Sequence, residues 1–349
     1  MKQLKYNIIM ILLILAHSLS ATKDSEVSRS ISKNYKVNVS TELDIHSSFG
    51  KVHINNWDKN EFDIQIEIIV RSSNEDKAQR IMDRIEIEIS ESGRSKSFRT
   101  DINNINTRNN ESFEVNYTVY MPKENPLRVK NSFGDVYVDD RAGEAELEVA
   151  YGALKAESLS DDSFVKVSFG SADIKSMEKG KMEIKYSDAE LGYLGTVDFT
   201  QGFSDVEIEE GDYLEMESKY GSMEIGKVQT LDVDAEFCKF EIGELTGSLD
   251  MEAKYVSGFT IEKVAKTFES IFIEGKFGSY ELYLEDGISA NFRGKFEFSD
   301  LRTSGVDINY SYRVKDSNES EYRGIIGDKS TRNTIDIDSS YGDCTIRRY

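Results

Sequence analysis

Residues that commonly build reactive centres are scarce in this sequence. Its 349 residues include two cysteines, three histidines, one tryptophan and two prolines. His46 and His53 flank Phe49 seven residues apart, a spacing that does not suit zinc, and neither has the serine or cysteine context of a catalytic triad. The sequence contains no Gly-x-Ser-x-Gly elbow and no glycine loop of the phosphate-binding or dinucleotide-binding kind. We therefore expect a protein that is not an enzyme, with no catalytic, cofactor-binding or metal-binding residue and no cofactor.

The sequence also lacks an excess of positive charge. Its 43 lysines and arginines are outnumbered by 64 aspartates and glutamates, which gives a net charge of −21 at pH 7. Such a surface repels phosphate backbones and anionic membranes, so we expect no nucleic-acid partner. Calcium binding is a less favoured alternative, because no EF-hand loop or glycine-aspartate nonapeptide array accompanies the acidic clusters, and aspartate after glycine is a common turn residue. The clusters are Asp135, Asp139 and Asp140 in one stretch and Asp161 and Asp162 in another.

Beyond its first residues, the sequence has no long apolar run. A short basic start is followed by an apolar stretch from Ile8 to Ala16 and by small residues up to Ala21, which is the pattern of a secretory signal peptide. The stretch is too short to span about 30 Å of hydrocarbon comfortably, and no cysteine follows it for lipid attachment. We predict that residues 1–21 are a signal peptide and that the protein is exported to the periplasm, the cell surface or the extracellular space. No membrane insertion is expected after cleavage.

Self-similarity is the strongest positive signal. A unit of alternating aliphatic residues, an aromatic residue, two small or polar residues and a second alternating pair recurs at 43–54, 127–138 and 335–346. Between Phe133 and Tyr255 the aromatic residues recur every 17 or 18 positions, and phenylalanine alternates with tyrosine. The complete aromatic series is Phe49, Phe133, Tyr151, Phe169, Tyr186, Phe203, Tyr220, Phe237, Tyr255, Phe277, Phe298 and Tyr341.

This pattern predicts an all-β protein, a single-stranded β-helix or β-solenoid. Alternation places every second residue of a short strand inward, and the glycine after the aromatic residue is expected to provide the bend. Stacked units would then bury a row of aromatic rings in the core, each contributing on the order of 2–3 kcal/mol. A coil of about 34–35 residues, made of two half-units, is favoured because coils half as long would stack like charges directly. The charges concerned are Glu190, Glu207, Glu224 and Glu241.

The two cysteines, Cys238 and Cys344, lie several repeats apart. A disulfide requires Cα atoms within about 7 Å, whereas stacked strands are separated by about 4.8 Å per layer. We therefore expect two free, partly buried thiols.

Residues 62–130 interrupt the repeat. Alternating isoleucines predict strands on either side of a helix that follows Ser72–Glu75, whose apolar face is formed by Ala78, Ile81 and Met82. Residues 93–112 are predicted to be a loop, and residues 313–333 a second, charged loop. The predicted organisation is a signal peptide over 1–21, a β-rich cap of β-α-β-β type over 22–130 and a repeat solenoid over 131–349.

The segments "SSFGKVHINNWDKNE", "YTVYMPKENPLRVKNSFGDVYVDD" and "SSYGDCTI" resemble a large family of exported bacterial adhesin-like proteins of unknown function. The resemblance covers nearly the whole chain after residue 21 and implies an exported single-stranded β-helix with an adhesive role. Tyr186-Ser and Tyr255-Val depart from the family's usual glycine-aspartate corner, which implies less regular coils there.

These observations favour an exported, envelope-associated binding, adhesive or scaffolding protein whose partner is an unknown extracellular or envelope ligand, a glycan or a protein. The alternative is a carbohydrate-active enzyme, a polysaccharide lyase or hydrolase on a β-helix scaffold, although no carboxylate pair stands out. Outward residues are expected to form cross-strand salt-bridge rows, and aromatic residues outside the series are not nominated as a site. The rows are Glu183, Glu217 and Glu252 with Lys185, Lys219 and Lys254; the other aromatic residues are Trp57, Tyr137, Tyr193, Tyr213 and Tyr283.

Overall fold

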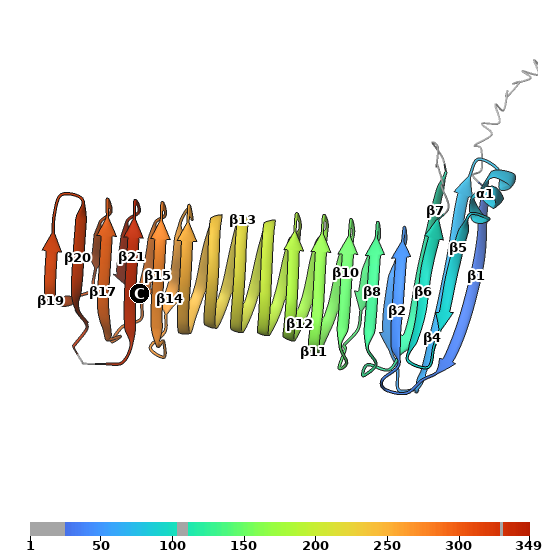
Figure 1. Cartoon of the computed structure of the whole chain (residues 1–349), viewed down its shortest axis with the longest axis horizontal. Helices are drawn as coiled ribbons and strands as arrows, with labels where there is room; N and C mark the ends of the chain where they lie inside the picture. The colour runs from blue at the N-terminus through green and yellow to red at the C-terminus, as the bar shows by residue number, and fades with distance from the viewer. Residues whose placement is uncertain (1–24, 103–110, 329–330) are drawn as a thin grey trace, which may run out of the picture.

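The protein is an elongated stack of β-strands with one short helix in the part that the structure describes (Figure 1). This computed structural model describes residues 25–102, 111–328 and 331–349; the predicted signal peptide lies outside these residues. The strands form one open sheet system rather than a closed barrel, and the predicted all-β class is confirmed. Within the described residues, no helix is both long enough and apolar enough to span a bilayer.

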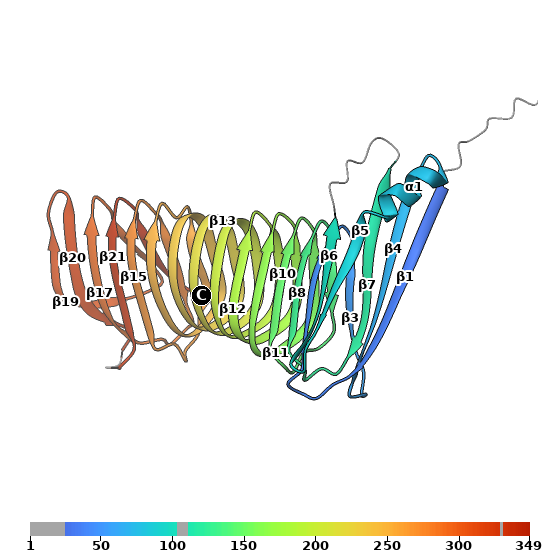
Figure 2. The same cartoon turned by 45° about the vertical axis from the view of Figure 1, so that its right-hand side comes forward.

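The repeating unit is a pair of strands joined by a corner. Strands β8 (Leu127–Ser132) and β9 (Val136–Val138) form one coil, and β10 (Ala145–Ala150) with the first half of β11 (Ala153–Ser168) forms the next. Strand β8 pairs in parallel with β10, and β9 with β11, so that equivalent residues lie side by side. Figure 2 shows the coils following one another along the long axis.

Each coil holds a single unit, so the predicted coil of two half-units is wrong. Leu127 pairs with Ala145, which belongs to the next unit of the chain. The same holds where β12 (Ser171–Lys185) meets β13 (Asp188–Lys254): Ser171 pairs with Asp188, again one unit later. The glutamates therefore do stack: Asp173 is the direct partner of Glu190, and Glu207 and Glu224 line the same shallow groove. Exposure to water explains why this is tolerated, because an open surface screens like charges to a fraction of a kcal/mol.

Aliphatic side chains from both strands of each coil fill the interior. Leu147 and Val149 of one strand and Leu154 and Ala156 of the next are each at most 2% exposed, and the residues between them point outward. Burial of this kind is worth about 25 cal/mol per Å² of apolar surface. The core is therefore a continuous column that one coil alone could not enclose.

At the N-terminal end, the first coil is formed by β2 (Glu42–Ser48) and β3 (Val52–Asn56), which stack directly on β8 and β9. The chain then leaves the stack and returns to it with strands that pair in parallel with the other side of β2 and β3. The two returning strands, β6 (Ser95–Ile102) and β7 (Ser112–Met121), also pair antiparallel with β5 (Ile85–Glu91) and β4 (Glu61–Ser72), respectively. Strand β1 (Ser25–Lys36) pairs antiparallel with β4, so that five strands close this end (Figure 1).

The predicted helix is present as α1 (Glu75–Met82). It begins at Asn74, whose side chain accepts a hydrogen bond from the backbone of Lys77 at 3.0 Å, and it buries Ala78, Ile81 and Met82. The loop predicted over 93–112 is partly wrong, because β6 occupies its first half; residues 103–110 lie outside the described part of the chain. Strand β6 is paired on both sides, with β5 just before it in the chain and with the distant β2, and its polar sequence alone does not distinguish it from a loop.

The C-terminal coil is inserted out of chain order. Strands β21 (Thr334–Ser340) and β22 (Cys344–Arg348) pair on one side with β15 and β16 and on the other with β17 and β18 (Figure 1). The long loop predicted over 313–333 is wrong: most of it belongs to an antiparallel hairpin of β19 and β20. These strands are β14 (Phe259–Val264), β15 (Ser270–Lys276), β16 (Tyr280–Leu284), β17 (Ala290–Glu297), β18 (Leu301–Ser304), β19 (Ile308–Lys315) and β20 (Glu319–Ile326).

Candidate functional site, an exposed aromatic ladder

Twelve aromatic rings form a single file along the corner edge of the stack. Neighbouring rings are nearly parallel, with centroids 4.5–5.2 Å apart and planes within 1–10° of each other. At this corner, each coil therefore contributes one ring to the contact with the next coil. In spatial order this aromatic ladder consists of Phe49, Phe133, Tyr151, Phe169, Tyr186, Phe203, Tyr220, Phe237, Tyr255, Phe277, Tyr341 and Phe298.

The rings lie outside the core, so the prediction of a buried aromatic row is wrong. The exposed fractions of these side chains run from 39% at Phe49 to 53% at Phe203. Each of the twelve residues has a φ of 50–59°, in the left-handed region, and they are the described non-glycine residues with positive φ. A left-handed residue breaks the inward-outward alternation of the strand, which turns the ring out at the corner.

Glycine after the aromatic residue serves close approach rather than the bend. A Cβ on Gly152 would lie 2.1 Å from the carbonyl oxygen of Gly134 in the preceding coil. Where serine replaces glycine, its hydroxyl bonds the backbone of a neighbouring coil: the amide of Gly170 donates to Ser187 Oγ at 3.1 Å. The coil at Tyr186 is therefore as regular as its neighbours, with a ring spacing of 4.9 Å, contrary to the expectation from the family pattern. At Tyr255 the ring spacing of 4.8 Å is kept, but the strand is interrupted between Lys254 and Phe259 and Gly258 has a φ of 80°, so this corner is less regular, as expected.

The ladder contains five tyrosine hydroxyls. None has a hydrogen-bond partner among residues 25–102, 111–328 and 331–349. Because a phenylalanine separates neighbouring tyrosines, two steps of 5.0 and 4.9 Å lead from the ring of Tyr151 to that of Tyr186. The ladder therefore presents an apolar strip with a polar group on every second ring.

Lysines precede three of these tyrosines and are paired with acids. Lys219 lies 2.6 Å from Glu217 of its own strand, which helps to raise the pKa of the lysine, whereas Lys254 lies 3.5 Å from Glu236 of the preceding coil. Lys185 lies 3.9 Å from Glu183. The predicted cross-strand rows are therefore only partly correct, since two of the three pairs lie within one coil.

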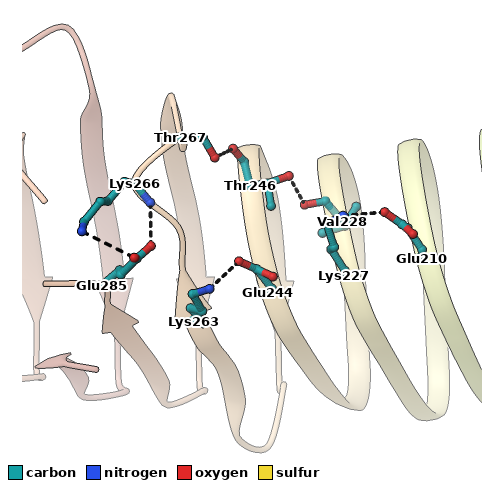
Figure 3. Close-up of polar contacts among 9 residues, drawn as sticks. All are labelled: Glu210, Lys227, Val228, Glu244, Thr246, Lys263, Lys266, Thr267 and Glu285. Atoms are coloured by element: carbon teal, nitrogen blue, oxygen red, sulfur yellow. Dashed lines mark hydrogen bonds and ion pairs between the residues drawn. The ribbon is translucent and has the colours of Figure 1, made fainter.

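The opposite edge of the stack is polar (Figure 3). There, Lys227 lies 2.6 Å from Glu210 and Lys263 lies 2.7 Å from Glu244, each pair joining adjacent coils. The Thr246 hydroxyl also donates to the carbonyl of a neighbouring coil at 3.2 Å. Proximity to Glu210 raises the pKa of Lys227. One edge of the solenoid is thus held by charges and hydroxyls, and the other by aromatic rings.

Comparison with family models now identifies the protein's relatives, because the Toastrack DUF4097 model matches residues 40–347. The chain belongs to this family. No curated protein sequence matches it. The predicted resemblance to a family of unknown function is confirmed by this match.

Three solved structures illustrate the similarity. A putative cell adhesion protein from Clostridium sporogenes is 14% identical, with 93% of this chain and 100% of the other covered and a TM-score of 0.19. A putative adhesin from Parabacteroides merdae is 10% identical over 92% and 96% of the two chains, with a TM-score of 0.34. A putative lipid binding protein from Parabacteroides distasonis is 10% identical over 91% and 96%, with a TM-score of 0.32.

Two of the aspartates considered as calcium ligands accept hydrogen bonds from the backbone of the neighbouring coil. Asp135 accepts from the backbone of Ala153 at 3.1 Å, and Asp140 accepts from the backbone of Ser158 at 3.2 Å. Asp162 pairs with Lys179 at 3.1 Å. Within the described part of the chain, no three histidine, cysteine, aspartate or glutamate side chains come together in a metal-binding arrangement. These aspartates therefore act as links between coils.

The two histidines make local side-chain contacts, and the two cysteines are buried. The ring of His53 stacks on Tyr137 at 4.5 Å, and burial lowers its pKa; His46 lies 3.0 Å from Asp44. Cys238 and Cys344 are free, buried thiols. Burial raises the pKa of Cys344 to about 12 and also raises that of Cys238, which makes both thiols poor nucleophiles.

Arg141 is a structural residue that the sequence did not reveal. It is fully buried and donates to the carbonyls of Pro122 and Asn125 at 3.0 and 2.5 Å and to the side chain of Asn56 at 3.1 Å. Burial lowers its pKa to about 10. A buried arginine with these partners fastens the returning insert to the first coils. A lone arginine between an aspartate pair and an alanine carries no such signal in the sequence.

Proposed function

We propose that this is an exported, envelope-associated binding, adhesive or scaffolding protein without catalytic activity, and that it contacts its ligand along the aromatic ladder. The observation that carries the proposal is the file of twelve rings, each 39–53% exposed. Contiguous apolar surface on a soluble protein marks an interaction site far more often than scattered apolar residues do. Export is supported by the predicted signal peptide, and the location is the periplasm, the cell surface or the outside of the cell.

The chemistry of the corner supports a role beyond holding the fold. A left-handed conformation costs a non-glycine residue on the order of 1 kcal/mol, and glycine or asparagine would avoid most of that cost. Ring stacking returns about 0.5–1.5 kcal/mol per contact. The two terms nearly cancel, so stability alone gives little reason to place an aromatic residue at all twelve corners.

The ladder is also prepared for binding. Each ring is fixed by its stacked neighbours, so a ligand orders few side chains on arrival and the entropic cost of association falls. Its length, eleven steps of 4.5–5.2 Å, suits an extended ligand or a large partner surface. The ligand is an extracellular or envelope molecule, a glycan or a protein.

A steric block tests the proposal. Ser171 and Ser257 are exposed and lie two residues after Phe169 and Tyr255, so cysteines introduced there place a bulky maleimide beside the ladder. The native thiols are buried and do not compete for the label. The control is the same label on Ser160→Cys, an exposed position outside the aromatic corner.

Labelled and unlabelled proteins are compared on arrays of glycans and envelope proteins, with and without calcium. We expect the unlabelled protein and the Ser160→Cys conjugate to bind the same ligand, and the ladder conjugates to lose that binding. Equal binding by all conjugates would remove the ladder from the proposal. Release of shortened glycan from the array would instead support the enzyme alternative.

A further inference from the structure

The alternation of phenylalanine and tyrosine follows the order of the coils in space rather than their order in the chain. Tyr341 belongs to the last coil, yet it stacks between Phe277 and Phe298 at 4.9 Å from each. Duplication of a two-unit repeat explains the alternation from Phe133 to Tyr255. It does not explain why the inserted coil carries tyrosine at this corner.

The assembled ladder therefore presents a regular array of hydroxyls. From Phe133 to Phe298 every second ring is a tyrosine, so that neighbouring hydroxyl-bearing rings are two coil steps apart. Stacking does not require these hydroxyls, since phenylalanine occupies equivalent places, and the described part of the protein offers them no partner. Their regular placement points to a ligand whose own polar groups repeat at the same distance.

Extended polymers differ in whether they match this repeat. A polypeptide strand advances about 3.3 Å per residue, so residues on one face recur near every 6.6 Å and come level with a hydroxyl only at every second tyrosine. A linear β-1,4-linked hexopyranose chain advances by nearly one coil step per sugar. Each sugar is turned over relative to the last, so equivalent hydroxyls face the same side at every second sugar, as the tyrosines do.

The negative charge of the protein favours an uncharged polysaccharide as the ligand. Residues 131–289, which carry most of the ladder, contain 14 lysines and arginines against 36 aspartates and glutamates, a net charge of −22. The nearby lysines are already paired with acids, as at Lys219 and Glu217. A polyanionic glycan would be repelled by this negative charge.

We infer, on the basis of the proposed function, that the ligand class is a neutral, linear β-1,4-linked glycan lying along the ladder. The tyrosine hydroxyls hydrogen-bond every second sugar, and the phenylalanine edges contact the apolar C–H groups between them. Contact accumulates with each added sugar, so affinity rises with the length of the oligosaccharide.

Calorimetric titration of the full chain with cello- and chito-oligosaccharides of two to eight sugars tests the inference. Malto-oligosaccharides of equal length, which are α-1,4-linked, serve as the ligand control. The variant Tyr186→Phe, Tyr220→Phe, Tyr255→Phe removes three hydroxyls and keeps every ring. Its protein control is Tyr193→Phe, Tyr213→Phe, Tyr283→Phe, which changes three tyrosines outside the ladder, and thermal unfolding checks that both triple variants remain folded.

We expect binding of at least one β-1,4-linked series, with affinity that rises through at least six sugars, and no binding of the malto-series. The ladder variant should bind at least about tenfold more weakly, which corresponds to the loss of three hydrogen bonds, each contributing at the lower end of the usual range. The control variant should bind as tightly as the parent protein. Equal affinity of the ladder variant and the parent would overturn the inference. Loss of array binding in the ladder conjugates without any β-1,4-glycan binding would overturn it too, while leaving the proposed binding function in place.

Discussion

At the scale of single residues, the aromatic corner combines an unfavourable backbone with a favourable side-chain contact. Tyr220 has a φ of 59° and lies 4.5 and 5.2 Å from the rings on either side. Asparagine tolerates the left-handed region better than tyrosine but removes both ring contacts.

We therefore expect Tyr220→Asn to lower the free energy of unfolding by up to about 2 kcal/mol, because two ring contacts are lost while about 1 kcal/mol of backbone strain is relieved. Tyr220→Phe, which keeps the ring, should change it by less than about 0.5 kcal/mol. Urea unfolding followed by circular dichroism measures both. A Tyr220→Asn variant more stable than the parent would mean that the ring contacts do not offset the backbone strain of the corner.

Glycine at the corner gives a second residue-scale prediction. A Cβ on Gly152 would approach a carbonyl oxygen of the preceding coil to 2.1 Å, whereas one on Gly93 would have no atom within 4 Å. Gly152→Ala should destabilise by about 3 kcal/mol, because two backbones must separate. Gly93→Ala is the matched control and should be close to neutral. Similar melting temperatures for the two variants would contradict the close approach of the coils.

The stacked acids give a pH-dependent prediction. Burial, followed by the charges of Asp250 and Asp234, raises the pKa of Asp232 above its ordinary value. The folded state thus holds this proton more tightly than the unfolded state, and stability is lost as the pH rises through that window. Asp232→Asn should raise the free energy of unfolding at pH 7 by up to about 0.5 kcal/mol, since the group is largely exposed. Urea unfolding at pH 3, below both pKa values, should show no gain; an equal gain at both values would exclude a charge effect.

Residue patterns predicted the strands and their inward aliphatic residues, but not which way the rings face. Alternation places Tyr220 on the same side as the buried Met216, and only the left-handed φ of the tyrosine reverses it. A sequence does not distinguish an aromatic residue in that conformation from one in a strand, because most aromatic residues avoid it. The predicted coil length is wrong for a related reason: the repulsion between stacked glutamates was considered without the screening that water provides at an exposed surface.

At the scale of elements, the ends of the stack depend on pairings between distant segments. Strand β21 pairs with β15 and with β17, both of which precede it by a long stretch of chain that includes the β19–β20 hairpin. The repeat predicted another coil at the C-terminus and could not place it, since all coils share one pattern. The charged residues of β19 and β20 resemble a surface turn in sequence, and only the assembled hairpin shows their pairing.

The last strand of the C-terminal end, β19, is paired on one edge only among the described strands. Its register shifts between Tyr310 and Tyr312, and Arg313 lies over the ring of the buried Tyr322 at 5.7 Å. Lys315 reaches Asp300 at 2.9 Å. A bulge and inward-directed charges are means by which proteins prevent edge strands from pairing with other molecules.

We expect the double variant Arg313→Ile, Lys315→Val to associate through this edge, because both charges that oppose a further strand are removed. Sedimentation velocity should show concentration-dependent oligomers. Arg323→Ile, on the neighbouring strand with both edges paired, is the control and should sediment like the parent. A double variant that does not associate would show that the bulge alone protects the edge.

At the scale of the whole molecule, the negative charge is concentrated in the part of the chain that carries most of the ladder. The net charge of −22 lies in residues 131–289, whereas residues 290–349 contain ten basic and ten acidic residues. The repelling charges keep the sides of neighbouring molecules apart, and the ladder remains as an uncharged strip along one edge. Composition predicted the acidity and the repeat predicted the elongated stack; the strip itself arises only when the coils are assembled.

The most direct test of the ladder as the binding surface is the NMR spectrum of the protein with isotope-labelled tyrosine rings, recorded during titration with chitohexaose or cellohexaose. Tyrosine-to-phenylalanine variants assign the signals. The account predicts that the ring signals of Tyr186, Tyr220 and Tyr255 shift together and saturably, while those of the buried Tyr117 and Tyr280 stay unchanged. Saturable shifts confined to tyrosines outside the ladder would contradict it.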